Sequence, residues 1–316
     1  MTDLRERLAT FRPDILRHCY RMLGSFADAE DVAQEALLNA WNARESQHGE
    51  VPVEHWLYRI ATNACLNELA RRKRRSLPAS EREPATVTEP LEESDAREWL
   101  TPAPDAALFG SPPRALETRE SVALAFLALL QRLPPRQRAV LLLKDVVGWQ
   151  AEEIAQALSL SLASVNSALH RARRTIASRP VEPGSDPPPE ALRAYVRCWE
   201  AHDVDSLVAL LKEDVVFSMP PHATWFRGAA DVERFLHSPR FTQHWAAGFR
   251  VVTTRANGQV ALAFYRRTEV DYRPSSVQLV RWVDGRVTEI VSFIGPEFHR
   301  GFGLPDHIEA PPPAAG

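Results

Sequence analysis

The side chains best suited to chemistry in this chain follow one another at helical spacing between Ser164 and Arg174. Those that can hydrogen-bond a base edge or a phosphate are Ser164, Ser167, His170, Arg171, Arg173 and Arg174. In the same stretch, apolar residues recur at spacings of four, three and four, which indicates one buried helix face; they are Val165, Leu169, Ala172 and Ile176. The polar residues therefore occupy faces that the core does not use, where they could contact a nucleic acid.

The elements that would position this helix come directly before it. Residues Glu152 to Leu158 predict a short helix, and its small Ala155 would let a second helix cross closely. Ser159 to Ser161 predict the turn, with Ser161 as N-cap of the next helix. The stretch thus predicts a helix-turn-helix. Because an ordinary helical hairpin with a solvated basic face would look much the same, the segments upstream must decide between the two.

Two longer amphipathic helices are predicted upstream. The segment DAEDVAQEALLNAW, residues 28–41, turns its apolar residues inward, namely Val32, Ala36, Leu37, Ala40 and Trp41. Its outward face carries Asp31, Gln34 and Glu35. A second helix over 54–75 ends in five consecutive basic residues, Arg71, Arg72, Lys73, Arg74 and Arg75. Cations suit a helix C-terminus, but five exceed what capping needs and favour a phosphate contact.

Proline-rich breaks divide the chain into folded parts. Residues 77–118 hold seven prolines and only 3 basic against 9 acidic residues, and residues 180–189 hold five prolines. Prolines exclude long helices from both stretches. The boundaries that we expect are 1–76, an acidic linker 77–118, 119–179, a short linker 180–187, 188–303 and a flexible tail 304–316.

The third part has a different periodicity. Helices at 190–201 and about 204–211 come first, and strand-like runs follow at 215–219, 249–255, 260–268, 276–283 and 286–293. Asp284-Gly285 predicts a hairpin turn between the last two runs. This order predicts an α+β domain, with a curved antiparallel sheet wrapped around its helices.

Composition excludes several classes of protein. The net charge is −3, and the three cysteines, Cys19, Cys65 and Cys198, lie far apart without zinc-ligand spacing or an even count for disulfides. No apolar run approaches the length of a membrane span, and the N-terminus lacks a signal-peptide core. We therefore expect a cytoplasmic protein with no metal, no cofactor and no membrane contact.

Residues 1–180 resemble the extracytoplasmic-function class of bacterial sigma factors, the promoter-recognition subunits of RNA polymerase. The residues that carry the resemblance are Asp31, Gln34 and Glu35, which match the exposed D-x-x-Q-E pattern, followed by WLYRIATNACLNELARRKRR. The resemblance implies that this trio binds the beta-prime clamp helices of core polymerase. It also implies that the loop 44–53 captures an unstacked base of the minus-ten element. Tyr58, Arg59 and Asn63 would then face the DNA strand, and the basic cluster 71–75 would hold its backbone.

Residues 133–173 resemble the domain that reads the minus-thirty-five element in the same family. The resemblance implies that Ser164, Ser167, His170 and Arg171 approach bases, while Arg173 and Arg174 hold phosphates. It also implies contact with the beta flap and a linker that enters the polymerase channels, with an anti-sigma factor as a further candidate partner. Ser159 departs from the family pattern, since many relatives carry Gly in that turn.

The linker motif Trp99 to Asp105, WLTPAPD, resembles one found in a subgroup with an extra C-terminal domain, although Ala103 replaces an aromatic residue. Residues 188–303 resemble that domain, the SnoaL-like fold, a cone with one open apolar pocket. We expect His222, Trp225, Asp214 and Asp271 near its mouth. No acid and base stand at a supported spacing, so we expect no catalytic residues.

These expectations together describe a multidomain protein with two all-α sigma domains, the second bearing the helix-turn-helix, and an α+β SnoaL-like cone. We expect a sigma factor that is not an enzyme and whose third domain regulates it in cis. Two alternatives remain: a helix-turn-helix regulator that never joins polymerase, and a bifunctional protein with an isomerase-like or cyclase-like C-terminal domain. A pocket that senses a small ligand is compatible with each of these.

Overall fold

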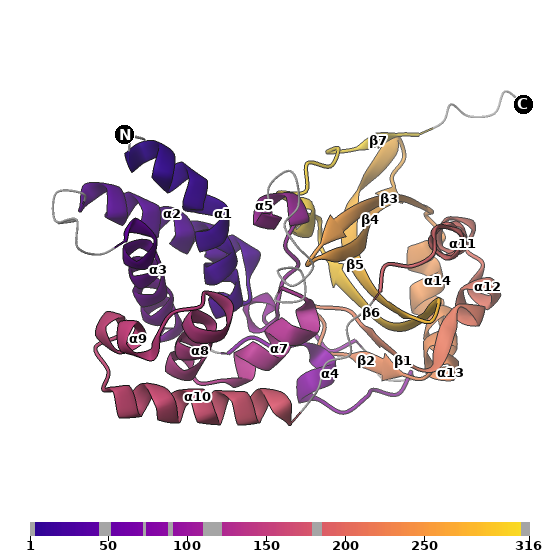
Figure 1. The fold of residues 1–316 in the computed structure, drawn as a ribbon. Helices are drawn as coiled ribbons and strands as arrows, with labels where there is room; N and C mark the ends of the chain where they lie inside the picture. The colour runs from indigo at the N-terminus through magenta and orange to yellow at the C-terminus, as the bar shows by residue number, and fades with distance from the viewer. Residues whose placement is uncertain are drawn as a thin grey trace, which may run out of the picture. The chain divides into compact units, whose positions relative to one another are not determined.

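The computed structural model describes residues 4–43, 52–71, 74–87, 91–109, 122–178 and 185–310. The chain forms two compact units, and both are discontinuous in sequence (Figure 1). Unit 1 comprises residues 1–76 and 105–182, and unit 2 comprises 77–104 and 183–316. The first part of the expected linker therefore belongs to the C-terminal unit.

Unit 1 is helical, and its first half is a three-helix cluster of α1 (Leu4–Leu23), α2 (Phe26–Asn42) and α3 (Val53–Leu69). Ser25 caps α2, because its hydroxyl accepts a hydrogen bond from the Asp28 amide. Between α1 and α3, the buried His18 Nε2 lies 2.8 Å from the Thr62 hydroxyl oxygen, and that hydroxyl donates to the carbonyl of Tyr58. The Thr62 oxygen therefore accepts the His18 Nε2 proton.

The second half of unit 1 contains the predicted helix-turn-helix. Its elements are α5 (Asp105–Phe109), α7 (Leu124–Arg132), α8 (Pro135–Leu141), a π-helical turn η3 (Leu142–Val146), α9 (Ala151–Ala157) and α10 (Leu162–Ala177). The N-cap prediction is confirmed, since the Ser161 hydroxyl accepts from the Ser164 amide at 3.2 Å. Ser159 adopts a positive φ of 53°, a left-handed conformation that favours glycine.

Arg138 joins the two halves of unit 1. Its buried guanidinium donates to the carbonyls of Met22, Leu130, Gln131 and Leu133 and to the Gln131 side chain. Burial lowers the pKa of Arg138 to about 9. This side chain therefore connects the end of α1 with α7 and α8.

Unit 2 packs helices against one curved sheet. The helices are α4 (Pro78–Glu81), η2 (Ala96–Glu98), α11 (Pro189–Ala201), α12 (Val204–Ala209), α13 (Ala229–Leu236), α14 (Pro239–Trp245) and η4 (Pro296–His299). The strands are β1 (Leu211–Ser218), β2 (Trp225–Arg227), β3 (Phe249–Ala256), β4 (Gln259–Arg267), β5 (Asp271–Val283), β6 (Arg286–Ile294) and β7 (Ile308–Glu309). The strand order is β2-β1-β6-β5-β4-β3, and β7 pairs with β5.

The predicted α+β pattern is confirmed, with two differences. β1 pairs with β6 in parallel, whereas the sequence predicted antiparallel pairing throughout. Helices α13 and α14 were not predicted at all. The Asp284-Gly285 hairpin is present, with positive φ at both residues, and Asn257-Gly258 makes a matching turn between β3 and β4.

The core of unit 2 lies between the sheet and helices α11 to α14. It is rich in aromatic side chains, among them Tyr195, Trp199, Phe217, Phe235, Trp245, Phe264 and Trp282. Ala85, Val87 and Leu91 from the linker pack against the same cluster. Among the described residues, no helix is both long and apolar enough to cross a membrane.

Candidate functional site

The outer face of α2 presents the expected polar trio. Asp31, Gln34 and Glu35 are all exposed. Two large apolar side chains on the same helix are exposed as well, Leu38 at 55 % and Trp41 at 37 %. Trp41 had been predicted to point inward, and that prediction is wrong. Polar groups beside exposed apolar ones are typical of a protein-binding surface.

The residues expected to contact the minus-ten DNA divide by burial. Arg59 and Asn63 are exposed on α3, whereas Tyr58 is buried edge-on against His18 and Trp149. Tyr58 is therefore part of the core in this structure.

In the basic cluster, Arg71 and Arg74 are exposed, while Arg72 and Lys73 lie outside the described residues. Arg75 is buried, and the assignment of this residue to phosphate is corrected. It forms an ion pair with Asp28 and donates to the Leu23 carbonyl at 3.1 Å. A buried guanidinium requires such partners. Through them, Arg75 connects the end of the basic cluster to the start of α2.

Helix α10 lies along the lower edge of unit 1 in Figure 1 and carries the residues of the expected recognition face. Ser164, Ser167, His170, Arg171 and Arg174 are all exposed, and Val165, Ala168, Leu169 and Ala172 form the buried face. Arg173 differs from the other arginines, because its guanidinium binds both oxygens of Asp145, at 2.6 and 3.0 Å. Arg173 is exposed as well, but its charge is paired with Asp145, so Arg171 and Arg174 are the better candidates for contact with DNA.

The linker is hydrogen-bonded to the C-terminal part of unit 2 at several points. Ala103, which is fully buried, donates its amide to the Asn257 side-chain oxygen at 3.0 Å and accepts from the Asn257 amide at 3.0 Å. The Trp99 indole N–H donates to the Pro221 carbonyl at 2.9 Å. The motif WLTPAPD thus supplies two of the attachment points.

A second group of bonds lies earlier in the linker. The Ala85 amide donates to the Trp225 carbonyl at 2.9 Å, and the Trp225 indole N–H donates to the Arg82 carbonyl at 3.0 Å. Nearby, the Ala223 amide donates to the Glu92 carbonyl, and the Glu92 amide donates to the Thr224 hydroxyl. Residues 82–87 and 91–103 therefore form a strap on unit 2, which we call the docked linker.

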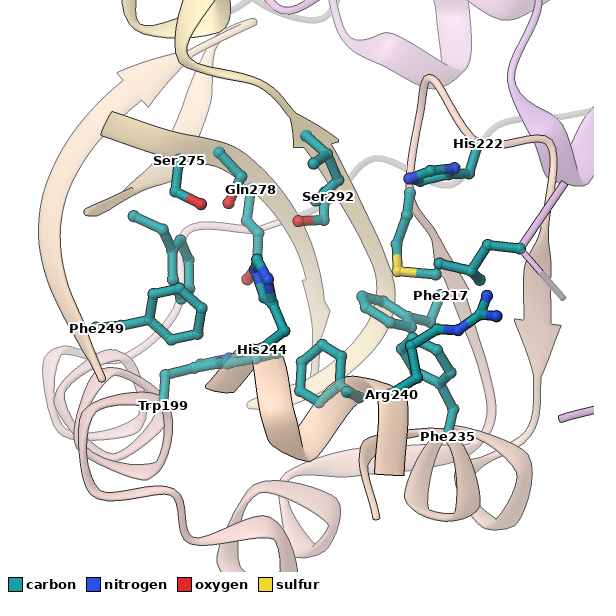
Figure 2. A pocket seen from close by; sticks show the side chains of 16 residues that line it. Trp199, Phe217, His222, Phe235, Arg240, His244, Phe249, Ser275, Gln278 and Ser292 are labelled. Atoms are coloured by element: carbon teal, nitrogen blue, oxygen red, sulfur yellow. The ribbon is translucent and has the colours of Figure 1, made fainter. Parts of the chain in front are cut away.

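Unit 2 contains a pocket of about 260 Å³ between the sheet and helices α13 and α14 (Figure 2). Aromatic side chains form most of its wall, and Leu91 of the docked linker completes it. The polar lining residues come from three places: His222 from the loop after β1, Arg240 and His244 from α14, and Ser275, Ser276, Gln278 and Ser292 from β5 and β6.

The polar groups of the pocket both donate and accept hydrogen bonds, except the Arg240 guanidinium, which only donates. Burial lowers the pKa of His222. The nearby Glu93 carboxylate acts in the opposite direction and the Arg240 cation lowers the pKa further, with the net shift downward. Burial and Arg266 lower the pKa of His244, whose Nδ1 lies 3.1 Å from the Arg266 guanidinium. Both imidazoles are therefore neutral near pH 7. None of the lining residues is acidic.

Of the residues expected at the pocket mouth, only His222 lines the pocket. Trp225 is buried on β2 with its indole on the linker. Asp271 binds the Thr268 hydroxyl at 2.7 Å and pairs with Arg273, so it stabilises the start of β5. Asp214 is an exposed residue of β1. The expectation for Trp225, Asp271 and Asp214 is therefore wrong.

Arg240, His244 and Gln278 were missed by the sequence interpretation. Gln278 had a detectable signal, since Ser276 and Gln278 alternate with the apolar Val277 and Leu279 and so share one face of the strand. For α14, Ser238 followed by Pro239 is a helix-start signature, and the structure uses it: the Ser238 hydroxyl accepts from the Phe241 amide.

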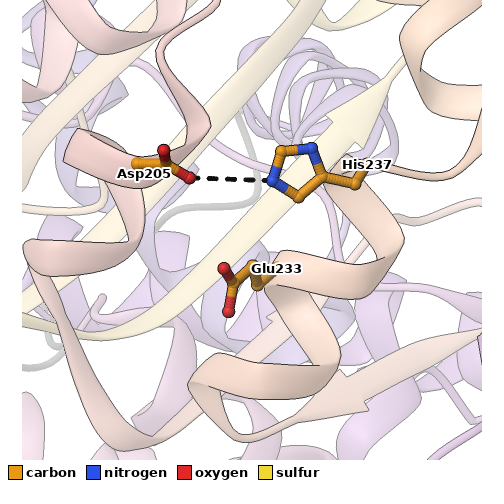
Figure 3. Close-up of side chains that lie close together, drawn as sticks. All are labelled: Asp205, Glu233 and His237. Atoms are coloured by element: carbon orange, nitrogen blue, oxygen red, sulfur yellow. Dashed lines mark ion pairs between the residues drawn. The ribbon is translucent and has the colours of Figure 1, made fainter.

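A separate surface cluster joins Asp205, Glu233 and His237 (Figure 3). Their ligating atoms lie within 4.8 Å of one another, and His237 Nε2 is 3.8 Å from an Asp205 oxygen. Three largely solvated groups are fewer than the four ligands of a structural zinc site. We assign no metal to them.

Three family models match the chain. Sigma-70 region 2 matches residues 8–75, Sigma-70, region 4 matches residues 123–176, and the SnoaL-like domain matches residues 192–290.

Two relatives match most of the chain. The ECF RNA polymerase sigma factor SigG of Mycobacterium tuberculosis is 38% identical over 315 residues, which cover 97% of this chain and 85% of the relative. SigJ of the same organism is 29% identical over 238 residues, covering 71% and 69%. The crystal structure of Mycobacterium tuberculosis SigJ matches the fold with a TM-score of 0.60 and 22% identity, over 96% of this chain and all of that chain.

Proposed function

This chain belongs to the extracytoplasmic-function sigma factors of RNA polymerase, and we propose which of its surfaces carry out that function and how its C-terminal unit controls them. As a sigma factor it binds core polymerase, directs the enzyme to promoter DNA and carries no catalytic activity of its own. Its SnoaL-like domain is fused to a sigma factor, as in SigJ. Because a sigma factor acts on RNA polymerase and DNA, we propose that the protein works in the cytoplasm.

We assign core-polymerase binding to the outer face of α2. Asp31, Gln34 and Glu35 offer carboxylates and an amide to a basic coiled coil, and the exposed Leu38 and Trp41 supply apolar area beside them. Apolar area contributes affinity, while the charges set orientation and association rate. This combination is the observation that supports the assignment.

We assign promoter contact to two surfaces of unit 1. Arg59, Asn63, Arg71 and Arg74 are exposed in and after α3, and Arg72 and Lys73 follow Arg71 in sequence. On α10, Ser164, Ser167, Arg171 and Arg174 recur every three to four residues and so share one exposed face, with His170 beside them. The hydroxyls and Arg171 suit base edges, and Arg174 suits a phosphate.

The docked linker supports regulation in cis. A sigma factor of this family needs its linker for polymerase, and here the docked linker is bonded to unit 2 through Ala85, Glu92, Trp99 and Ala103. The same chain segment cannot occupy both places. The C-terminal unit therefore restrains the factor by holding its linker, and release of the linker activates it.

Binding to core polymerase tests the first assignment. The double variant Asp31→Lys/Glu35→Lys should lose at least tenfold in affinity for core polymerase, measured by fluorescence anisotropy, because charge reversal places like charges together. The matched control, Glu6→Lys/Glu152→Lys, reverses two other exposed carboxylates of unit 1 and should bind like the parent. Equal loss in both variants would show a non-specific charge effect and remove the assignment.

A further inference from the structure

We propose that the pocket of unit 2 is a receptor for a small ring-bearing carboxylic acid, whose carboxylate binds Arg240, and that the bound acid stabilises the docked linker through Leu91. The pocket is distinct from the polymerase and DNA surfaces, which lie in unit 1. Its occupant follows from three properties of the lining: shape, sign of charge and uncommitted donors.

The lining selects an apolar ring. Phe217, Phe235, Phe241, Phe249, Phe264 and Trp199 all contribute to the wall. Aromatic faces and edges pack well against a planar ring, and each such pair adds to the burial of area. The volume of about 260 Å³ lies just below the range of roughly 300–1,000 Å³ typical of ligand pockets, so the ring system is small.

The charges at the pocket select an anion. Arg240 stands at its exposed rim and forms no ion pair or hydrogen bond with any described residue. No acidic residue lines the pocket, and both lining histidines are neutral near pH 7 for the reasons given above. A guanidinium binds a carboxylate through paired charge-assisted hydrogen bonds. A cationic ligand would find no counter-charge in the lining.

The pocket residues on β5 and β6 favour a ligand with an oxygen atom at a second position. Gln278 is only 3 % exposed, and its Oε1 accepts the Tyr195 hydroxyl proton at 3.0 Å, which leaves Nε2 directed away from that bond. Within the described structure, Nε2 and the hydroxyls of Ser276 and Ser292 have no hydrogen-bond partner in the protein. These atoms open onto the pocket, where a ligand that displaced water from them without replacing its hydrogen bonds would lose affinity. A hydroxyl or carbonyl oxygen on the ring would satisfy them.

Leu91 couples the ligand to the linker. It belongs to the docked linker and lines the pocket, so its contact with a ligand exists only while the linker is docked. A ligand that binds the docked state better must shift the equilibrium toward that state, and by reciprocity docking must tighten ligand binding. This regulatory half rests on the cis-regulation proposed above, whereas the binding half does not.

Titration calorimetry on the full chain tests the binding half with 6-hydroxy-2-naphthoate, which carries a carboxylate and a hydroxyl on a small ring system. Its neutral amide should bind about tenfold or more weakly, because the charge-assisted bonds are lost. Arg240→Gln should weaken the naphthoate to the level of the amide and leave the amide unaffected. Arg234→Gln, on α13 and paired with Asp231 outside the pocket, is the matched control and should change neither.

Amide hydrogen exchange in the same samples tests the regulatory half. Saturating 6-hydroxy-2-naphthoate should slow exchange at the Ala85 and Ala103 amides, and Leu91→Ala should weaken its binding several-fold. No saturable binding, or equal affinities for acid and amide, would overturn the receptor. Binding without slower exchange would overturn the coupling through Leu91. Rapid exchange at Ala85 and Ala103 without ligand would instead refute the docked linker and leave the receptor intact.

Discussion

Replacing Asn257 by glycine should release the linker without disturbing the sheet that holds it. Asn257 occupies a left-handed position, φ 55°, at the turn between β3 and β4, a conformation that glycine adopts without strain. Asn257→Gly therefore preserves the turn and removes the oxygen that accepts the Ala103 amide. Because Ala103 is fully buried, that amide is left without an acceptor in the docked state.

The magnitude follows from the cost of one unsatisfied buried donor, about 1–3 kcal/mol. At 25 °C this makes undocking of the linker about 5- to 160-fold more frequent. Hydrogen exchange measured by mass spectrometry reports it directly at the Ala103 amide, which lies between Pro102 and Pro104 and is the only N–H of that tripeptide.

Asp284→Gly is the matched control for this change. Asp284 holds the corresponding left-handed position of the hairpin between β5 and β6, φ 54°, and its only described partner is Lys212 at 3.7 Å on the surface. Asp284→Gly also introduces a glycine at a left-handed position, so it changes backbone freedom in the same way as Asn257→Gly, but it removes no contact with the linker. If Asn257→Gly left Ala103 as protected as in the parent chain, or if Asp284→Gly exposed it equally, the reasoning would be refuted.

Three predictions concern the stability of unit 1, each checked by urea unfolding. Burial lowers the pKa of His18 to about 3, so the folded state binds fewer protons than the unfolded chain below pH 6.5, and stability falls as pH drops from there. About 2 kcal/mol should be lost between pH 8 and pH 5, a slope that His18→Gln should remove. Ser159→Gly should stabilise the chain by about 1 kcal/mol, since it relieves the left-handed serine; an unchanged midpoint would contradict this. Arg138→Met should cost about 3 kcal/mol or more, because it leaves several carbonyls without their charged donor, and a cost below 1 kcal/mol would remove the role given to this side chain.

The sequence was most informative where structure depends on neighbours along the chain. The buried stripe of α10, the Ser161 cap and the Asp284-Gly285 turn follow from local spacing and backbone chemistry, and all three are present. The order of helices and strands in unit 2 was accessible for the same reason.

Contacts between distant segments could not be derived in this way. Arg75 is paired with Asp28, 47 residues away, and Trp225 is bonded to Arg82, 143 residues away. Local spacing therefore could not show whether either side chain is buried in such a contact or exposed at the surface. Trp41 fits an apolar stripe, yet it is 37% exposed near the end of α2, and spacing along one helix does not show which part of the stripe its neighbours cover.

The pocket was predicted only in outline for a related reason. Its donors come from strands β5 and β6 and from α14, which are brought together by the curvature of the sheet. Without α14 in the predicted order of elements, Arg240 and His244 had no assigned position.

Run-off transcription with bacterial core polymerase on a promoter library tests the central claim most directly, using the parent chain, Asn257→Gly and Asp284→Gly. Core polymerase alone should give no promoter-specific transcript, the parent chain should give one, Asn257→Gly should give more, and Asp284→Gly should match the parent. No specific transcript with any of the three chains would contradict the function. Output from Asn257→Gly at or below the parent level would contradict restraint of the sigma factor by its docked linker.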